Sequence, residues 1–117
     1  MNKIDYYMCR GSYKNCRNIT VEEAYEILKT NPSAILLDVR SCQEYDEGHL
    51  CGSININVYH LNRCVEKIIE DKETTIIVYC QGDVRSGEAV EILCHKGYLD
   101  VYHICRGIKR DIKKCGF

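Results

Sequence analysis

The chain has 117 residues, a formal net charge of −1 and nine cysteines. This length fits one domain around a single core, and the near-zero charge offers no basic field of the kind that nucleic-acid binders use to neutralise phosphates. No apolar run approaches the roughly 18 residues that span a bilayer, and the first residues lack the apolar core of an export signal. We therefore expect one cytoplasmic domain with neither a nucleic-acid nor a membrane partner.

The cysteines are predicted to be free thiols. Their number is odd, no export signal precedes them, and cytosolic thiols are normally kept reduced. Cys9 and Cys16 are close enough in the sequence to pair, but nothing beyond their proximity supports that disulfide. The chain has neither a C-x-x-C pair nor a zinc-finger spacing of cysteine and histidine, so we expect no metal and no cofactor.

Helices and strands are predicted to alternate from residue 20 onward. Thr20 and Glu23 form a capping box for a first helix, and the apolar run AILLDV at 34–39 is typical of a buried strand. Ser41 and Glu44 form a second capping box for a helix of about two turns ending near Gly48. The alternating segment ININ at 54–57 indicates a strand nearer the edge of a sheet.

The second half of the chain continues this alternation. Apolar stripes predict a third helix after residue 57, through Leu61, Cys64, Val65 and Ile68, and a fourth through Ala89, Val90, Leu93, Cys94 and Gly97. Strands are expected at 74–80 and 101–105, and Ile108, Ile112 and Cys115 keep helical spacing to the end. Alternation of this kind favours a mostly parallel sheet covered on both faces, within a domain at 17–117 preceded by an extension at 1–16.

Cys80 stands where chemistry is expected in such a fold. It ends the strand at 74–80, and the loop CQGDVR then leads to a helix predicted to start near Ser86. Ligands of parallel α/β sheets bind beyond the carboxyl ends of strands, and a helix start together with Arg85 favours a thiolate. The alternative is a buried, inert thiol, which is what we expect of Cys64, Cys94, Cys105 and Cys115.

Two segments resemble the single-domain rhodaneses, which are sulfurtransferases. They are LLDVRSCQEYDEGHLCGSININV at 36–58 and VYCQGDVRSGEAVEILCHKGYLDVYHICRGI at 78–108. The second contains a six-residue loop from Cys80 to Arg85 followed by Ser86, and the first matches the family pattern in Asp38, Arg40, Glu44, Tyr45, Gly48, His49, Gly52, Ser53 and Asn55. The resemblance implies a three-layer α/β sandwich, with helices on both faces of a mostly parallel five-stranded sheet.

The resemblance also implies a persulfide mechanism. Cys80 would take a sulfane sulfur from a small donor or a persulfidated protein and pass it to a thiol or a protein cysteine. By the same resemblance the substrate would be held by the loop that follows, Gln81, Gly82, Asp83, Val84 and Arg85, with Asp38, Arg40 and Ser86 in support. Glu44 and His49 are interpreted as structural. The alternative is a rhodanese-fold interaction or regulatory module without enzymatic activity.

The length and residues of the loop refine this interpretation. Dual-specificity phosphatases that share the fold have five residues between cysteine and arginine, whereas four intervene here, which suits a single sulfur atom. The family's usual fourth-position glycine is replaced by Asp83, a residue type that tolerates the left-handed region and that offsets the charge of Arg85. We therefore expect poor use of thiosulfate. Cys42 is a weaker candidate, as a thiol that resolves the persulfide by forming a disulfide with Cys80.

Overall fold

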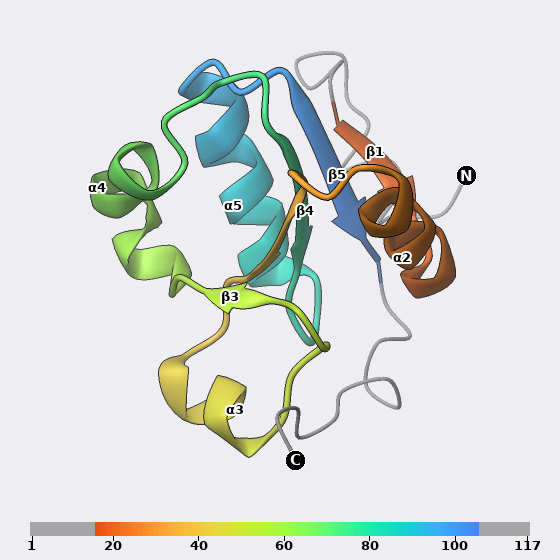
Figure 1. The fold of residues 1–117 in the computed structure, drawn as a ribbon. Coiled ribbons are helices and arrows are strands. Elements are labelled where there is room, and N and C mark those ends of the chain that lie inside the picture. The colour runs from red at the N-terminus through yellow and green to blue at the C-terminus, as the bar shows by residue number, and fades with distance from the viewer. Residues whose placement is uncertain (1–15, 106–117) are drawn as a thin grey trace.

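The structure, a computed structural model, describes residues 16–105 and has a single five-stranded sheet (Figure 1). All the paired strands are parallel, in the order β1-β5-β4-β2-β3. This arrangement confirms the predicted α/β class and the predicted mostly parallel sheet. The elements are β1 (Cys16–Ile19), α2 (Val21–Thr30), β2 (Ile35–Asp38), α3 (Cys42–Glu47), β3 (Ile54–Asn55), α4 (Val58–Ile68), β4 (Thr75–Tyr79), α5 (Val84–His95) and β5 (Asp100–Ile104).

The helices lie on both faces of the sheet and at one end of it. Figure 1 shows α4 and α5 on one face, α2 on the other, and α3 beyond the carboxyl ends of the strands. The α4 and α5 face buries the larger apolar cluster, and the α2 face buries a smaller one around Ala24, Leu36 and Ile77. Strand β4 contributes to both clusters and is buried along its whole length. The carboxyl end of this central strand is therefore held from both sides.

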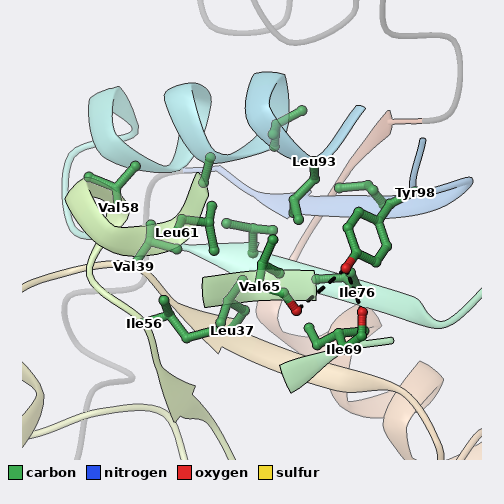
Figure 2. Packing of buried hydrophobic residues seen from close by; sticks show 14 of the residues in the cluster. Leu37, Val39, Ile56, Val58, Leu61, Val65, Ile69, Ile76, Leu93 and Tyr98 are labelled. Carbon is green, nitrogen blue, oxygen red and sulfur yellow. Dashed lines mark hydrogen bonds between the residues drawn. The ribbon is translucent and has the colours of Figure 1, made fainter. Parts of the chain in front are cut away.

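Packing of α4 corrects one detail of the predicted apolar stripe. Leu61 and Val65 are fully buried as expected, but Ile68 is 52% exposed and Ile69 is buried in its place. Figure 2 shows the cause, because the Tyr98 hydroxyl donates to the backbone carbonyl of Ile69 over 2.5 Å and pins the end of the helix there. In the fourth stripe, Gly97 lies beyond the end of α5 with φ of +92°, so it ends the helix rather than packing on its face.

Both predicted capping boxes are present, at Thr20 with Glu23 and at Ser41 with Glu44. Strand β3 is confirmed at the sheet edge, although it has 2 residues rather than the four of ININ. Strand β1 was not predicted; it starts at Cys16, the last residue assigned to the extension, and pairs in parallel with β5. Residues 1–15 and 106–117, which include the expected helical spacing at Ile108, Ile112 and Cys115, lie outside the described residues.

Free thiols are confirmed at Cys42, Cys64, Cys80 and Cys94. Cys51 is disulfide-bonded, so the expectation of free thiols is wrong for this residue. Cys9, the suggested partner of Cys16, lies outside the described residues. Across residues 16–105 we find no helix that is both long and apolar enough to cross a membrane. Within the same range there is no group of three or more side chains suited to holding a metal ion.

Candidate active site at Cys80

Cys80 directly follows β4 and is 1% exposed. Its sulfur accepts a hydrogen bond from the backbone N–H of Ser86, with 3.2 Å between the two atoms. This contact follows from where α5 begins, at Val84 rather than at the predicted Ser86. Ser86 therefore lies in the first helical turn, where backbone N–H groups have no partner inside the helix. Because the N-cap residue Asp83 makes no side-chain cap, the sulfur of Cys80 satisfies one of these donors.

Asp83 occupies the left-handed backbone region, which aspartate was expected to tolerate. Its φ of +70° makes it the one non-glycine residue with positive φ between residues 16 and 105. Aspartate tolerates this region better than most residues because its short polar side chain can bond locally. Its carboxylate Oδ1 lies 3.8 Å from Nε2 of His103. The negative charge of the loop therefore faces the interior histidine.

His103 belongs to the site although the sequence interpretation passed over it. It lies in β5 with its side chain fully buried, and its Nε2 is 2.6 Å from the Ser86 hydroxyl oxygen. Burial lowers the pKa of His103 from 6.5 to about 4, and the nearby Asp83 charge opposes this shift only in part. His103 is therefore neutral at pH 7. An ionisable residue in a buried strand is the signal that could have identified it.

On its other side the His103 ring contacts two more residues. Nδ1 lies 3.3 Å from Oδ1 of Asn18, on β1, and 3.2 Å from the sulfur of Cys105. Strand β1, which was not foreseen, therefore contributes to the surroundings of the site. Cys105 was expected to be an inert buried thiol, but it is half-buried and touches this histidine.

Arg85 is held by Glu44 of α3. Its Nη1 and Nη2 donate to the two carboxylate oxygens of Glu44 over 2.6 and 3.0 Å. The hydrogen bond from Arg85 and those from Ser41 lower the pKa of Glu44 to about 2, against the opposing effect of burial. Glu44 thus has its predicted capping role and a second one, which is to tie the active-site loop to α3. An incoming anion would have to compete with Glu44 for Arg85.

Asp38 and Arg40 form a buried ion pair at the neighbouring strand end. Arg40 Nη2 donates to Asp38 Oδ2 over 2.8 Å and also to the carbonyl of Gly48, while the Tyr79 hydroxyl donates to Asp38 over 2.6 Å. Burial and the bond to Asp38 raise the pKa of Tyr79, so its hydroxyl remains a donor. Tyr79 immediately precedes Cys80, so this network fixes the end of β4.

The structure brings some of the predicted site residues together and leaves others apart. Ser86 contacts the sulfur directly, whereas Asp38 and Arg40 act one residue away, through Tyr79. In the loop, Gln81, Gly82 and Val84 are exposed. The ring of His49, interpreted as structural, stacks on Tyr45 with 3.7 Å between centroids. Cys42 is exposed at the first position of α3.

Comparison with known proteins agrees with this geometry. The model of the rhodanese-like domain matches residues 20–113, so the chain belongs to the rhodanese-like domain family. A rhodanese-related protein from Thermoplasma volcanium has a similar structure, with a TM-score of 0.68 and 32% identity, over 81% of this chain and 89% of that one. A rhodanese with anions from E. coli gives a TM-score of 0.60 and 33% identity, over 68% and 91% of the two chains.

The curated relatives are longer proteins. A tRNA uridine(34) hydroxylase from Hamiltonella defensa subsp. Acyrthosiphon pisum (strain 5AT) is 33% identical over 94 residues, which are 77% of this chain and 26% of that protein. The chain therefore spans about a quarter of the length of such relatives.

Proposed function

We propose that this protein is a sulfurtransferase in which Cys80 carries a sulfane sulfur between a donor and a thiophilic acceptor. The observation that carries the proposal is the sulfur of Cys80 lying 3.2 Å from the Ser86 N–H, at the start of α5. A helix start stabilises an anion through its unpaired donors and its partial positive charge. Both the thiolate and the persulfide formed from it are anions that this position favours.

The chemical step needs only the thiolate and a donor. The thiolate attacks the outer sulfur of the donor, a sulfur–sulfur bond forms at Cys80, and the donor leaves with the electrons of the bond that breaks. A thiol or a protein cysteine then attacks the terminal sulfur and regenerates the Cys80 thiolate. Because Cys80 is 1% exposed, the surroundings of its sulfur must open when a donor approaches.

Mass spectrometry of the intact protein tests this function. After incubation with thiosulfate or a low-molecular-weight persulfide, we expect the wild type to gain the mass of one sulfur atom and to lose it on addition of a thiol. Cys80→Ser should gain nothing, whereas Cys42→Ser, a matched change at an exposed cysteine, should load normally. An unaltered wild-type mass with every donor would favour the alternative, a rhodanese-fold interaction or regulatory module.

We further propose that persulfides are better donors than thiosulfate. Arg85 is already paired with Glu44, and the loop carries the Asp83 carboxylate, so a small dianion finds little uncompensated positive charge there. We expect a thiosulfate kcat/KM below about 10⁴ M⁻¹s⁻¹, the low end of ordinary enzymes, and a higher value in Asp83→Asn. A wild-type value at or above that limit would contradict this preference.

Cys42 remains a proposed resolving thiol. If the Cys42 thiolate attacks the inner sulfur of the Cys80 persulfide, the terminal sulfur leaves as hydrosulfide with the electrons of the broken bond, and a disulfide joins the two residues. Non-reducing peptide mapping after sulfur transfer is the test. A Cys42–Cys80 peptide would support the role, and its absence after complete turnover would remove it.

The tRNA uridine(34) hydroxylase activity is that of relatives about four times as long as this chain. The net charge of −1 offers little electrostatic attraction for a tRNA backbone. The contacts of Cys80 favour sulfur chemistry instead.

A further inference from the structure

The hydroxyl of Ser86 lies between the sulfur of Cys80 and the ring of His103. Its oxygen is 3.2 Å from the sulfur and 2.6 Å from Nε2. A hydroxyl has one proton to donate, so whatever orients that proton decides what Ser86 offers to the sulfur. Both the sulfur and the histidine ring are buried, so water does not compete for the hydrogen bonds of Ser86.

Two proton arrangements fit this geometry. When His103 has its proton on Nδ1, Nε2 accepts from the Ser86 hydroxyl, and the oxygen of Ser86 accepts from the Cys80 thiol. When His103 has its proton on Nε2, it donates to Ser86, and the hydroxyl proton is released toward Cys80 or the Asp83 carbonyl, 3.2 Å away. An anionic sulfur attracts that proton more strongly than a neutral carbonyl does. The first arrangement suits a thiol and the second an anion.

The far side of the ring has a partner for each arrangement. Oδ1 of Asn18, at 3.3 Å, accepts a proton from Nδ1, and the thiol of Cys105, at 3.2 Å, donates to Nδ1 when that atom is bare. Buried polar groups without partners are costly, so a pocket that satisfies only one tautomer would lock the ring. This pocket satisfies both.

We propose that His103 is a positioning residue for the sulfur of Cys80, acting through the hydroxyl of Ser86 and switching tautomer as the sulfur becomes anionic. On ionisation the thiol proton passes to Ser86 and the Ser86 proton passes to Nε2, while the Nδ1 proton passes to the sulfur of half-buried Cys105 as the Cys105 thiol proton leaves to water, so the ring remains neutral. The same Nε2–H form then holds the anionic persulfide. Only this persulfide step rests on the proposed sulfurtransferase function.

The ionisable groups facing His103 come from three elements. Asp83 approaches from the start of α5, Cys80 acts through Ser86 from the end of β4, and Cys105 follows β5. The Asp83 charge favours a second proton on the ring, and burial opposes it more strongly. The ring is therefore neutral above about pH 6, where the switch can be observed.

Nitrogen NMR of protein labelled with [¹⁵N]histidine tests the switch in the wild type. At a pH where alkylation shows Cys80 to be a thiol we expect the Nδ1–H form of His103, and at a pH where alkylation shows a thiolate, or after persulfidation, we expect the Nε2–H form. In Cys80→Ser the form should not change with pH, and exposed His60 should show no dependence on Cys80. A single tautomer in every wild-type state would overturn the proposal. The comparison of thiol with thiolate needs no sulfur transfer, so its outcome is independent of the proposed function.

The pH profile of Cys80 alkylation by iodoacetamide, read by peptide mass spectrometry, tests the same coupling kinetically. Ser86→Ala and His103→Leu should each move the midpoint upward by about one pH unit, which slows alkylation at pH 7 about tenfold. Alkylation of the double variant should be no slower than that of either single variant, because both changes break the same hydrogen-bond chain from His103 through Ser86 to Cys80. Ser86→Thr should restore the profile, and His60→Gln should not alter it. A wild-type profile in folded His103→Leu, or effects that add in the double variant, would contradict the proposal.

Discussion

The ends of β2 and β4 are neighbours in the sheet, yet the two junctions that follow them are built differently. After β2, Asp38 and Arg40 neutralise each other, and Ser41 caps α3 with a complete capping box. After β4, the N-cap Asp83 offers no side-chain bond to α5, and the sulfur of Cys80 takes an N–H of the first turn. The first junction satisfies its own polar groups. The second leaves a backbone N–H of the helix start to bind the sulfur of Cys80.

The largest expected effect concerns the junction after β2. Asp38→Ala leaves Arg40 buried without its carboxylate and the Tyr79 hydroxyl without its acceptor. Removing one partner of a buried ion pair costs about 3–5 kcal/mol, so we expect a loss of this size in the free energy of unfolding. Denaturant unfolding measures it. Glu66→Ala, which removes a half-exposed carboxylate paired with Lys72 and Lys96, should change stability little. Equal losses in the two variants would show that the buried pair is not structural.

The next effect concerns the junction after β4 and the pH dependence of stability. His103 has a pKa of about 4 in the folded protein and an ordinary value of 6.5, so the unfolded chain binds a proton first as the pH falls. Burial of the neutral His103 ring has no cost in protonation above pH 6.5. As the pH falls from about 6.5 to 4, the free energy of unfolding should decrease by up to about 3 kcal/mol because the unfolded chain takes up this proton first. Unfolding measured over this range should show a steeper decline in the wild type than in His103→Leu. Parallel curves would contradict it.

A smaller effect concerns the ion pair that joins the two junctions. Glu44→Gln keeps a residue that can complete the capping box but removes the charge that holds Arg85. We expect a loss of about 1–2 kcal/mol at pH 7, typical of hydrogen bonds between charged groups. Because the pKa of Glu44 is about 2 rather than 4.5, this contribution is present above pH 4.5 and disappears as the pH falls toward 2. Stability curves of the two proteins should therefore converge in acid.

The smallest effects should have opposite signs at the two helix starts. Ser41→Ala removes the cap of α3 and should lower the free energy of unfolding by about 1 kcal/mol. Asp83→Gly removes no side-chain cap and relieves a left-handed backbone, so it should raise that free energy by less than about 1 kcal/mol. Thermal unfolding of both variants is the measurement. A loss in Asp83→Gly as large as that in Ser41→Ala would show that Asp83 acts as a cap.

Local signals in the sequence were enough for most of the fold. Both capping boxes depend on residues three positions apart, and the buried strands β2 and β4 are continuous apolar runs, so neighbouring residues predict them. Strand β1 has no such pattern. It is short, and its pairing depends on β5, from which it is separated by most of the chain.

The candidate site was predictable to a similar extent. Cys80 and Ser86 follow from the order of strand, loop and helix and were expected, whereas for Asp83 the sequence showed only a residue type that tolerates the left-handed region. The ion pair of Glu44 with Arg85 and the hydrogen bond between His103 and Ser86 were not expected, because each joins residues far apart in sequence. Nothing close to Arg85 in sequence shows that its charge is already paired.

The pairing of β1 with β5 has a consequence for how the protein is made. Asn18 and His103 are 85 positions apart in the chain, and their strands are direct neighbours. Chains emerge from the ribosome with the N-terminus first, and contacts between distant segments form slowly. Strand β1 therefore cannot pair until β5, near the end of the domain, has been synthesised. The histidine behind the reactive sulfur acquires its full set of neighbours among the last events of folding.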